Sequence, residues 1–368
     1  MTFEQRLAEI LARCRERKLD VLVALHDGAH FIEKPDPVMV LTGFKALGPV
    51  AALLDREGAV TLVVTPSWDA ERAREMCPAV RIVAADDVIG GLKKVFPDFC
   101  GAIGVAGLAA FPFGLARHFF EWAPRSAVAD DAVFVPARRK TDIELAHARE
   151  ATRIAEAGFA RLLQIARPGM SEDDLAAELR WHSKSLGAED NFALMCAGPH
   201  NKAVAPSNGR QMQAGDIIVC ELTPSYRGQL AQICRTVVLG EATPLLREKY
   251  ALVVHAMDKG FAAAQPGATM ADVCRAINGV LEAEGYGEYC YPPHIRRRGH
   301  GLGFAAHGPG DVALDNATLL EPDMLFMIHP NQYLPETGYL LCGEPAVMNA
   351  DGARALTSQK AALAEIPV

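Results

Sequence analysis

The chain has 368 residues, enough for two domains. Half of the residues are hydrophobic and 22% are charged, which is the balance of a folded globular protein and excludes intrinsic disorder. The 37 Lys and Arg residues are outnumbered by 45 Asp and Glu residues, and the formal net charge of −8 argues against a nucleic-acid-binding protein.

The N-terminus leads directly into a charged amphipathic segment without the apolar stretch of a signal peptide. Residues 99–116 carry no charge, but their glycines and proline favour a strand, a turn and a loop over a membrane helix. The nine cysteines are scattered and include no C-x-x-C pair, which is typical of reduced thiols. We therefore expect a cytoplasmic protein with no membrane segment.

The first part of the chain alternates helical patterns with short apolar runs. Apolar residues at helical spacing predict a helix over residues 4–18. Two apolar runs separated by a turn-forming segment at 55–58 predict a hairpin. The predicted strands cover residues 20–25, 50–54, 59–64, 81–83 and 102–105. These elements predict a small mixed α/β domain over residues 1–137.

A second domain is predicted over residues 138–368, beginning with a long helix from about 142 to 166. It contains an internal repeat, because residues 167–175 resemble residues 265–273: each has Pro-Gly followed by a Ser or Thr helix cap. Two related halves of this kind would close over one shared site. The strands expected to carry its side chains are 191–196, 216–222 and 229–239 in the first half, and 300–306, 324–329 and 345–348 in the second.

This domain contains several ordered motifs: Gly-Asp-Ile-Ile-Val at 215–219, Arg-Thr at 235–236, Gly-His-Gly-Leu-Gly at 299–303 with His307, and Leu-Glu-Pro-Asp-Met at 320–324. Together they resemble the motifs of the creatinase/aminopeptidase P family, which is peptidase M24-like. The resemblance implies an α/β (α+β) protein. A small mixed N-terminal domain would be followed by a pseudo-symmetric C-terminal domain with the pita-bread fold.

The resemblance also implies where metal ligands would stand. Metal-dependent members carry two Asp, one His and two Glu around two divalent ions. In this chain these positions hold Glu221, Gln232, His300 and His329, and the last falls at Cys342 or Gly343 beside Glu344. Because hard or borderline cations need several anionic oxygens, we predict that the protein has no dinuclear centre and needs no metal cofactor.

Creatinase offers a precedent, since it keeps the fold, lacks the metal and hydrolyses a C–N bond with a histidine and carboxylates. Its histidine falls at Val204 here, and His200 is the nearest substitute. The main hypothesis is a homodimeric, creatinase-like hydrolase that cleaves a C–N bond of a small carboxylate-bearing molecule by histidine acid–base catalysis. The predicted catalytic residues are His200, Glu221, His300, His307 and His329.

The predicted substrate-binding residues are Gln232, Arg235, Arg298 and Glu344, with Lys45 leaning over the site of the partner subunit. The arginines suit a carboxylate. One alternative is a metal-dependent hydrolase or Xaa-Pro peptidase-like enzyme, in which Glu221, His300 and His329 hold one zinc, iron or manganese ion. The other is a catalytically inactive pita-bread binding protein. Five further histidines are interpreted as structural, namely His26, His118, His147, His182 and His255.

Overall fold

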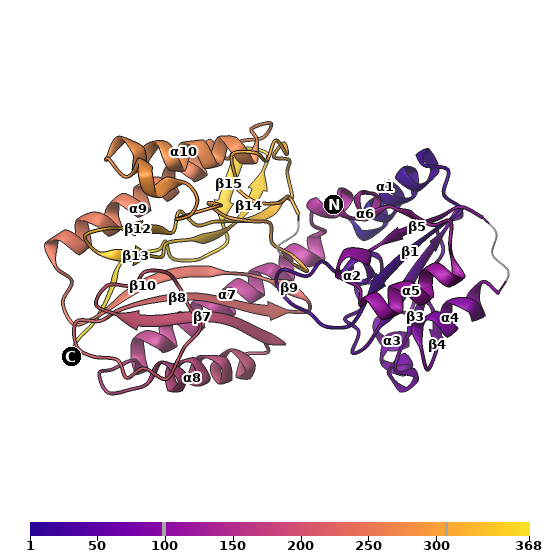
Figure 1. Ribbon diagram of the computed structural model, residues 1–368, viewed down its shortest axis with the longest axis horizontal. Helices are drawn as coiled ribbons and strands as arrows, with labels where there is room; N and C mark the ends of the chain where they lie inside the picture. The colour runs from indigo at the N-terminus through magenta and orange to yellow at the C-terminus, as the bar shows by residue number, and fades with distance from the viewer. Residues whose placement is uncertain (98–100, 306–307) are drawn as a thin grey trace. The chain divides into compact units, whose positions relative to one another are not determined.

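The computed structural model describes residues 1–97, 101–305 and 308–368 (Figure 1). The chain forms two compact units. The N-terminal unit comprises Met1–Asp142 with a short segment that begins at Phe304, and the C-terminal unit comprises Ile143–Gly303 and Gly308–Val368. Among the described helices, none has both the length and the apolar content that a membrane span requires.

The N-terminal unit is built on a six-stranded sheet in the order β4-β3-β2-β1-β5-β6. The predicted hairpin is confirmed, since β2 and β3 pair antiparallel, and β1 joins β2 antiparallel and β5 parallel. The mixed sheet agrees with the predicted α/β domain. The strands are β1 (Val21–His26), β2 (Val50–Asp55), β3 (Val60–Val64), β4 (Arg81–Ala84), β5 (Ile103–Ala106) and β6 (Ala127–Val128).

Helices cover both faces of this sheet because successive strand side chains point to opposite sides. Leu22 and Ala24 of β1 pack in a core with residues of α1, α2, α3 and α6, whereas Val21, Val23 and Leu25 pack in a second core with residues of α4 and α5. The helices are α1 (Phe3–Glu16), α2 (Pro37–Thr42), α3 (Ala70–Met76), α4 (Val88–Val95), α5 (Phe113–Trp122) and α6 (Asp130–Phe134).

The first half of the C-terminal unit is a sheet in the order β16-β10-β8-β7, with β9 paired to β8. Apolar residues of α7 and α8, among them Leu162 and Leu175, pack against one face of this sheet and fill its core. The predicted long helix is α7 (Asp142–Ile165). The other elements are α8 (Glu172–Ser185), β7 (Asp190–Gly198), β8 (Ile217–Tyr226), β9 (Gln229–Leu230), β10 (Ile233–Leu239) and β16 (Ala364–Ile366).

The second half repeats the pair of helices with α9 and α10, which lie side by side near β14 and β15 (Figure 1). The internal repeat is visible in its caps: Ser171 accepts a hydrogen bond from Asp174 N at the start of α8, and Thr269 accepts one from Asp272 N at the start of α10. The elements are α9 (Pro244–Ala263), α10 (Met270–Ala283), β11 (Leu325–Ile328), β12 (Gln332–Leu334), β13 (Gly338–Leu340), β14 (Glu344–Asn349) and β15 (Gly352–Ala355).

One predicted strand of this half is absent from the described residues. Residues 300–305 form no strand there, and Gly301 makes only a single β-bridge, to Phe326 of β11. The glycines explain the difference, because Gly299 and Gly303 both have φ above +140°, a backbone conformation outside the strand region.

Candidate functional site

The alternation of side chains along β8 and β10 decides which residues share a face. Ile218, Cys220 and Ile233 pack into the core beneath the sheet. Glu221 therefore points to the opposite face of β8, and its register partner on β10 is Cys234. The candidate site is built on this face, away from α7 and α8.

Glu221 is held by two neighbours on that face. Asn331 Nδ2 donates to Glu221 Oε1 over 3.1 Å, and the Cys234 thiol lies 3.8 Å from the same oxygen. Burial raises the pKa of the Glu221 carboxyl, while the contacts of Cys234 and Asn331 and the charge of Arg297 act in the opposite direction. The carboxylate is thus oriented rather than free to rotate.

His300 is buried, and both of its ring nitrogens face a polar group. Nδ1 lies 2.9 Å from the Gly301 carbonyl oxygen, and Nε2 lies 3.0 Å from Gln232 Oε1. The amide nitrogen of Gln232 donates to Thr223 Oγ1 over 3.2 Å. Both ring nitrogens of His300 thus face acceptor oxygens, so a neutral ring donates to one of them and turns its lone pair toward the other.

His329 directly follows β11, and its ring centroid lies 5.3 Å from that of His300. Its Nδ1 is buried and has no hydrogen-bond partner among the residues that the structure describes. Burial and the neighbouring His300 lower the pKa of His329 well below its ordinary value, so the imidazole is neutral near pH 7. Gly343 leaves the room for this ring, because a Cβ at position 343 would lie 2.5 Å from His329 Cβ.

Arg235 and Glu344 contact each other. Arg235 shares the strand face of Ile233, and its guanidinium lies over the ring of Phe159 in α7. It donates to the carbonyl of Gly343 over 2.9 Å and forms a buried ion pair with Glu344, N to O distance 3.1 Å. The predicted substrate contacts of these two residues stay a prediction, because the ion pair already explains why both are buried.

Arg298 is also engaged with protein groups. Its guanidinium donates to Asn278 Oδ1, to the carbonyls of Pro330 and Asn331, and to Gln332 Oε1. These bonds fix the segment that follows His329. Its predicted role toward a substrate carboxylate likewise stays a prediction.

His200, a further predicted site residue, is exposed, and its Nε2 lies 3.0 Å from the Pro335 carbonyl. Lys45 belongs to the N-terminal unit, and His307 lies outside the described residues. Cys342, one of two residues considered for the last ligand position, is fully buried, and its N–H donates to Asn331 Oδ1 over 3.1 Å.

Asn331 is the site residue that sequence reasoning missed. Its amide group joins Glu221 to the backbone of Cys342, so it ties the two halves of the unit together. Its position in the sequence could have identified it, because it lies two residues after His329 and just beyond a predicted strand. Polar side chains at strand ends often line sites.

Comparisons with known proteins agree with the fold. The model of "Metallopeptidase family M24" matches residues 146–354. The Xaa-Pro dipeptidase of Pyrococcus furiosus is 25% identical over 89% of this chain and 92% of its own length. An uncharacterized peptidase of Bacillus subtilis is 29% identical over 67% of this chain and 74% of its own length.

Solved structures share the whole architecture. The Xaa-Pro dipeptidase from Bacillus anthracis superposes with a TM-score of 0.86 and 21% identity, covering 99% of this chain and 100% of that one. The prolidase from Pyrococcus horikoshii gives a TM-score of 0.85 and 21% identity, covering 97% and 99%. The predicted M24-like pita-bread fold and the predicted class, a hydrolase acting on C–N bonds, are confirmed.

The same match corrects the cofactor prediction. We predicted that no metal is needed, and the match to a metallopeptidase family over more than half of the chain overturns this. The reasoning gave too much weight to the missing carboxylates. Imidazoles are also good ligands for zinc and iron(II), and the two considered in the metal-dependent alternative, His300 and His329, lie at this site.

The residues fit one ion better than two. Glu221 supplies one carboxylate, His300 supplies one buried imidazole, and His329 has a buried Nδ1 without a hydrogen-bond partner among the described residues. Two histidines and one carboxylate are a known set for a single zinc or iron ion. In the described part of the chain, these ligand atoms do not all lie within 4.8 Å of one another.

Proposed function

Because the chain belongs to metallopeptidase family M24, we propose that it is a metal-dependent peptidase that cleaves short peptides. Glu221, His300 and His329 would hold one divalent ion, in place of the larger carboxylate set that the family resemblance implies. Two observations support this proposal: the imidazoles of His300 and His329 lie with ring centroids 5.3 Å apart, and Asn331 holds the Glu221 carboxylate in the same unit. This was the alternative to the creatinase-like hypothesis.

The bound ion would polarise a carbonyl and lower the pKa of a bound water. The protein's own residues prepare the donors. Asn331 holds the Glu221 carboxylate, and the Gly301 carbonyl and Gln232 Oε1 contact the two ring nitrogens of His300. Such partners of metal ligands are commonly worth ~10–100-fold in metal affinity or activity. We therefore assign Asn331 and Gln232 as positioning residues.

The substrate class follows from the relatives. Two curated relatives that cover most of this chain are named Xaa-Pro dipeptidases, so dipeptides with a C-terminal proline are the first substrates to test. Such a substrate is a small carboxylate-bearing molecule with a scissile C–N bond. We keep the proposals of a cytoplasmic homodimer, of Lys45 acting in the partner's site, and of further contributions from His200 and His307.

The test is hydrolysis of a panel of Xaa-Pro dipeptides by the purified full chain. The enzyme is dialysed against a strong chelator and reloaded with zinc, manganese or iron(II), one at a time. We expect activity to disappear on chelation and to return with one ion per chain. Glu221→Gln should bind the active-site ion more weakly, with activity lower by about 10²-fold or more.

His255→Ala is the matched control, because this residue is interpreted as structural and should leave turnover close to that of the unmodified chain. Turnover that survives chelation and the Glu221→Gln substitution would contradict the metal-dependent mechanism. Binding of proline dipeptides with no turnover under any metal would instead support the inactive binding protein.

A further inference from the structure

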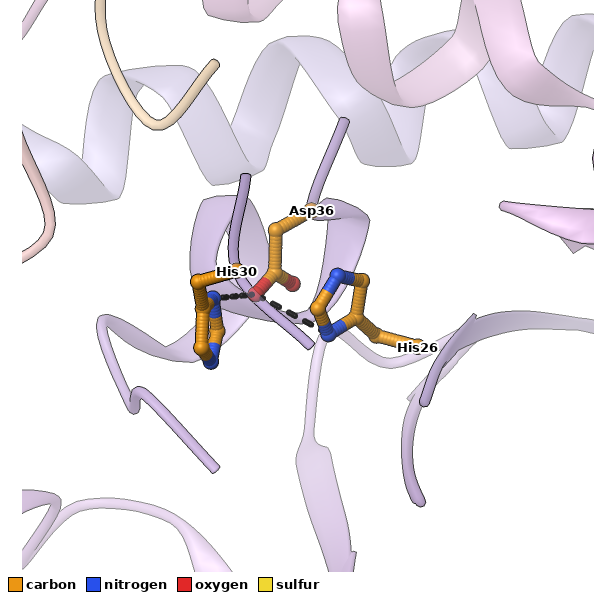
Figure 2. Close-up of side chains that lie close together, drawn as sticks. All are labelled: His26, His30 and Asp36. Atoms are coloured by element: carbon orange, nitrogen blue, oxygen red, sulfur yellow. Dashed lines mark ion pairs between the residues drawn. The ribbon is translucent and has the colours of Figure 1, made fainter. Parts of the chain in front are cut away.

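A second group of metal-ligating side chains lies in the N-terminal unit. His26 is the last residue of β1, Asp36 caps the start of α2, and His30 lies on the loop between them. Figure 2 shows the two imidazoles on either side of the Asp36 carboxylate. Within residues 1–97, 101–305 and 308–368, these three form the one group of three His, Cys, Asp or Glu side chains with all ligand atoms within 4.8 Å.

Contacts with the backbone indicate which ring nitrogen of His26 and of His30 carries a lone pair. In both histidines it is the nitrogen that faces the Asp36 carboxylate. His30 Nε2 lies 3.0 Å from the Ala46 carbonyl, an acceptor only, so Nε2 carries the hydrogen and Nδ1 the lone pair. His26 Nδ1 lies 3.1 Å from Gly28 N, whose N–H donates to it, so this nitrogen also carries a lone pair. In His30, the bond from the second ring nitrogen to a backbone carbonyl is the arrangement typical of metal-ligating histidines.

Two imidazole nitrogens therefore face one carboxylate oxygen. His26 Nδ1 and His30 Nδ1 lie 3.4 and 3.3 Å from the same oxygen, Asp36 Oδ2, while Asp36 Oδ1 accepts from Met39 N. One proton can bridge Oδ2 to only one of the two nitrogens. A divalent cation can bind all three groups at once.

The distances match a small tetrahedral ion. Zinc binds imidazole nitrogen and carboxylate oxygen at roughly 2.0–2.2 Å, which at the tetrahedral angle places ligand atoms about 3.3 Å apart. The two nitrogen-to-oxygen distances have this length. Calcium and magnesium prefer a shell of oxygen atoms, so the two imidazoles favour a transition metal.

We propose that His26, His30 and Asp36 bind one divalent transition-metal ion of the zinc class. When the ion binds, it replaces the Gly28 N–H as the partner of the His26 Nδ1 lone pair, and its fourth position is filled by water. His26 and Asp36 are each 2% exposed, whereas the side chain of His30 is 18% exposed, so the ion enters past His30. The ion joins the end of β1 to the start of α2 and closes the loop between them.

The experiment must separate this site from the proposed active-site ion. We would use the full chain with Glu221→Gln, stripped with a chelator, and titrate it with zinc and, in parallel, with cobalt(II). We expect one ion per chain, a visible cobalt(II) spectrum of a tetrahedral site and a higher unfolding temperature with zinc. Adding His30→Ala or Asp36→Asn should weaken this binding at least ~100-fold, in line with the loss of a direct ligand.

Asp36→Asn is the conservative variant, because an Asn side chain keeps an oxygen to cap Met39 N and replaces the charged ligand oxygen with an NH2 group that cannot bind the ion. The matched control is His118→Ala, an exposed histidine of the same unit that pairs with Glu121. The assignment would be overturned if the Glu221→Gln chain still bound one zinc ion after each ligand substitution was added. It would also be overturned if the Glu221→Gln chain itself bound no zinc tightly. Either result leaves the peptidase assay untouched, so the two proposals fail separately.

Discussion

Replacing Glu344 with glutamine should destabilise the C-terminal unit through the charge left on Arg235. Arg235 and Glu344 are 3% and 1% exposed, and their charged atoms lie 3.1 Å apart. At an effective dielectric constant of 20, that distance corresponds to about 5 kcal/mol of attraction. The substitution removes this attraction and leaves a buried, uncompensated guanidinium.

The expected loss is about 3–5 kcal/mol of unfolding free energy, the range for breaking one partner of a buried ion pair. The lower end is favoured, because glutamine can still accept from Ala361 N, which donates to Glu344 Oε1 over 2.7 Å. Arg235 also keeps its bonds to the carbonyls of Cys234 and Gly343. The double variant Arg235→Met with Glu344→Gln should lose less than the sum of the single variants.

Urea unfolding, followed by circular dichroism and by tryptophan fluorescence, measures these differences. Glu365→Gln is the control, since Glu365 pairs with Arg247 at the surface and should change stability by less than ~1 kcal/mol. A Glu344→Gln protein with unchanged stability and a raised KM would refute the reasoning. It would show that Glu344 contacts substrate, as the sequence analysis predicted.

Three further substitutions probe the site and the internal repeat. His300→Gln should keep the fold, seen by circular dichroism, and lower the rate of dipeptide hydrolysis by at least about 10²-fold; a rate within twofold of the original would remove His300 from the site. Gly343→Ala should push His329 out of place, because the added Cβ would lie 2.5 Å from His329 Cβ; a crystal structure with an unmoved ring would contradict this. The bonds of Thr269 lower the pKa of Asp272 from 3.8 to about 2. The ionised carboxylate therefore stabilises the fold above pH 3.8, and that contribution is lost as the pH falls through about 2. Unfolding of the original chain and of Asp272→Asn across this range should show their difference shrinking toward acid; a constant difference would count against the cap.

The elements of the fold were largely predictable because their patterns are local. The hairpin of β2 and β3 was marked by two apolar runs around a turn, and the paired caps at Ser171 and Thr269 marked the repeat. The face of Arg235 was also readable, since Ile233 precedes it by two residues in a strand. That alternation places Arg235 on the core side of the sheet, a point that the sequence analysis did not use.

Contacts that depend on loop paths were not predictable in the same way. The spacing of His26, His30 and Asp36 matches no known motif. The fold brings these residues together only because the end of β1 lies close to the start of α2. His26 was interpreted as structural for that reason. Asn331 reaches both Glu221 and Cys342 because it follows β11, and such a contact requires the path of the chain after the strand.

The packing of Gly343 against His329 constrains the order in which this site can change during evolution. A glutamate introduced at position 343 alone would clash with the imidazole. Its Cβ would lie 2.5 Å from His329 Cβ and 2.8 Å from Met327 Cε. A smaller residue introduced at 329 alone would leave a cavity beside Gly343. Each step is unfavourable unless the other accompanies it. The histidine-containing site is therefore separated from a carboxylate-rich one by a coupled pair of substitutions, and lineages carrying both residues would tend to retain them.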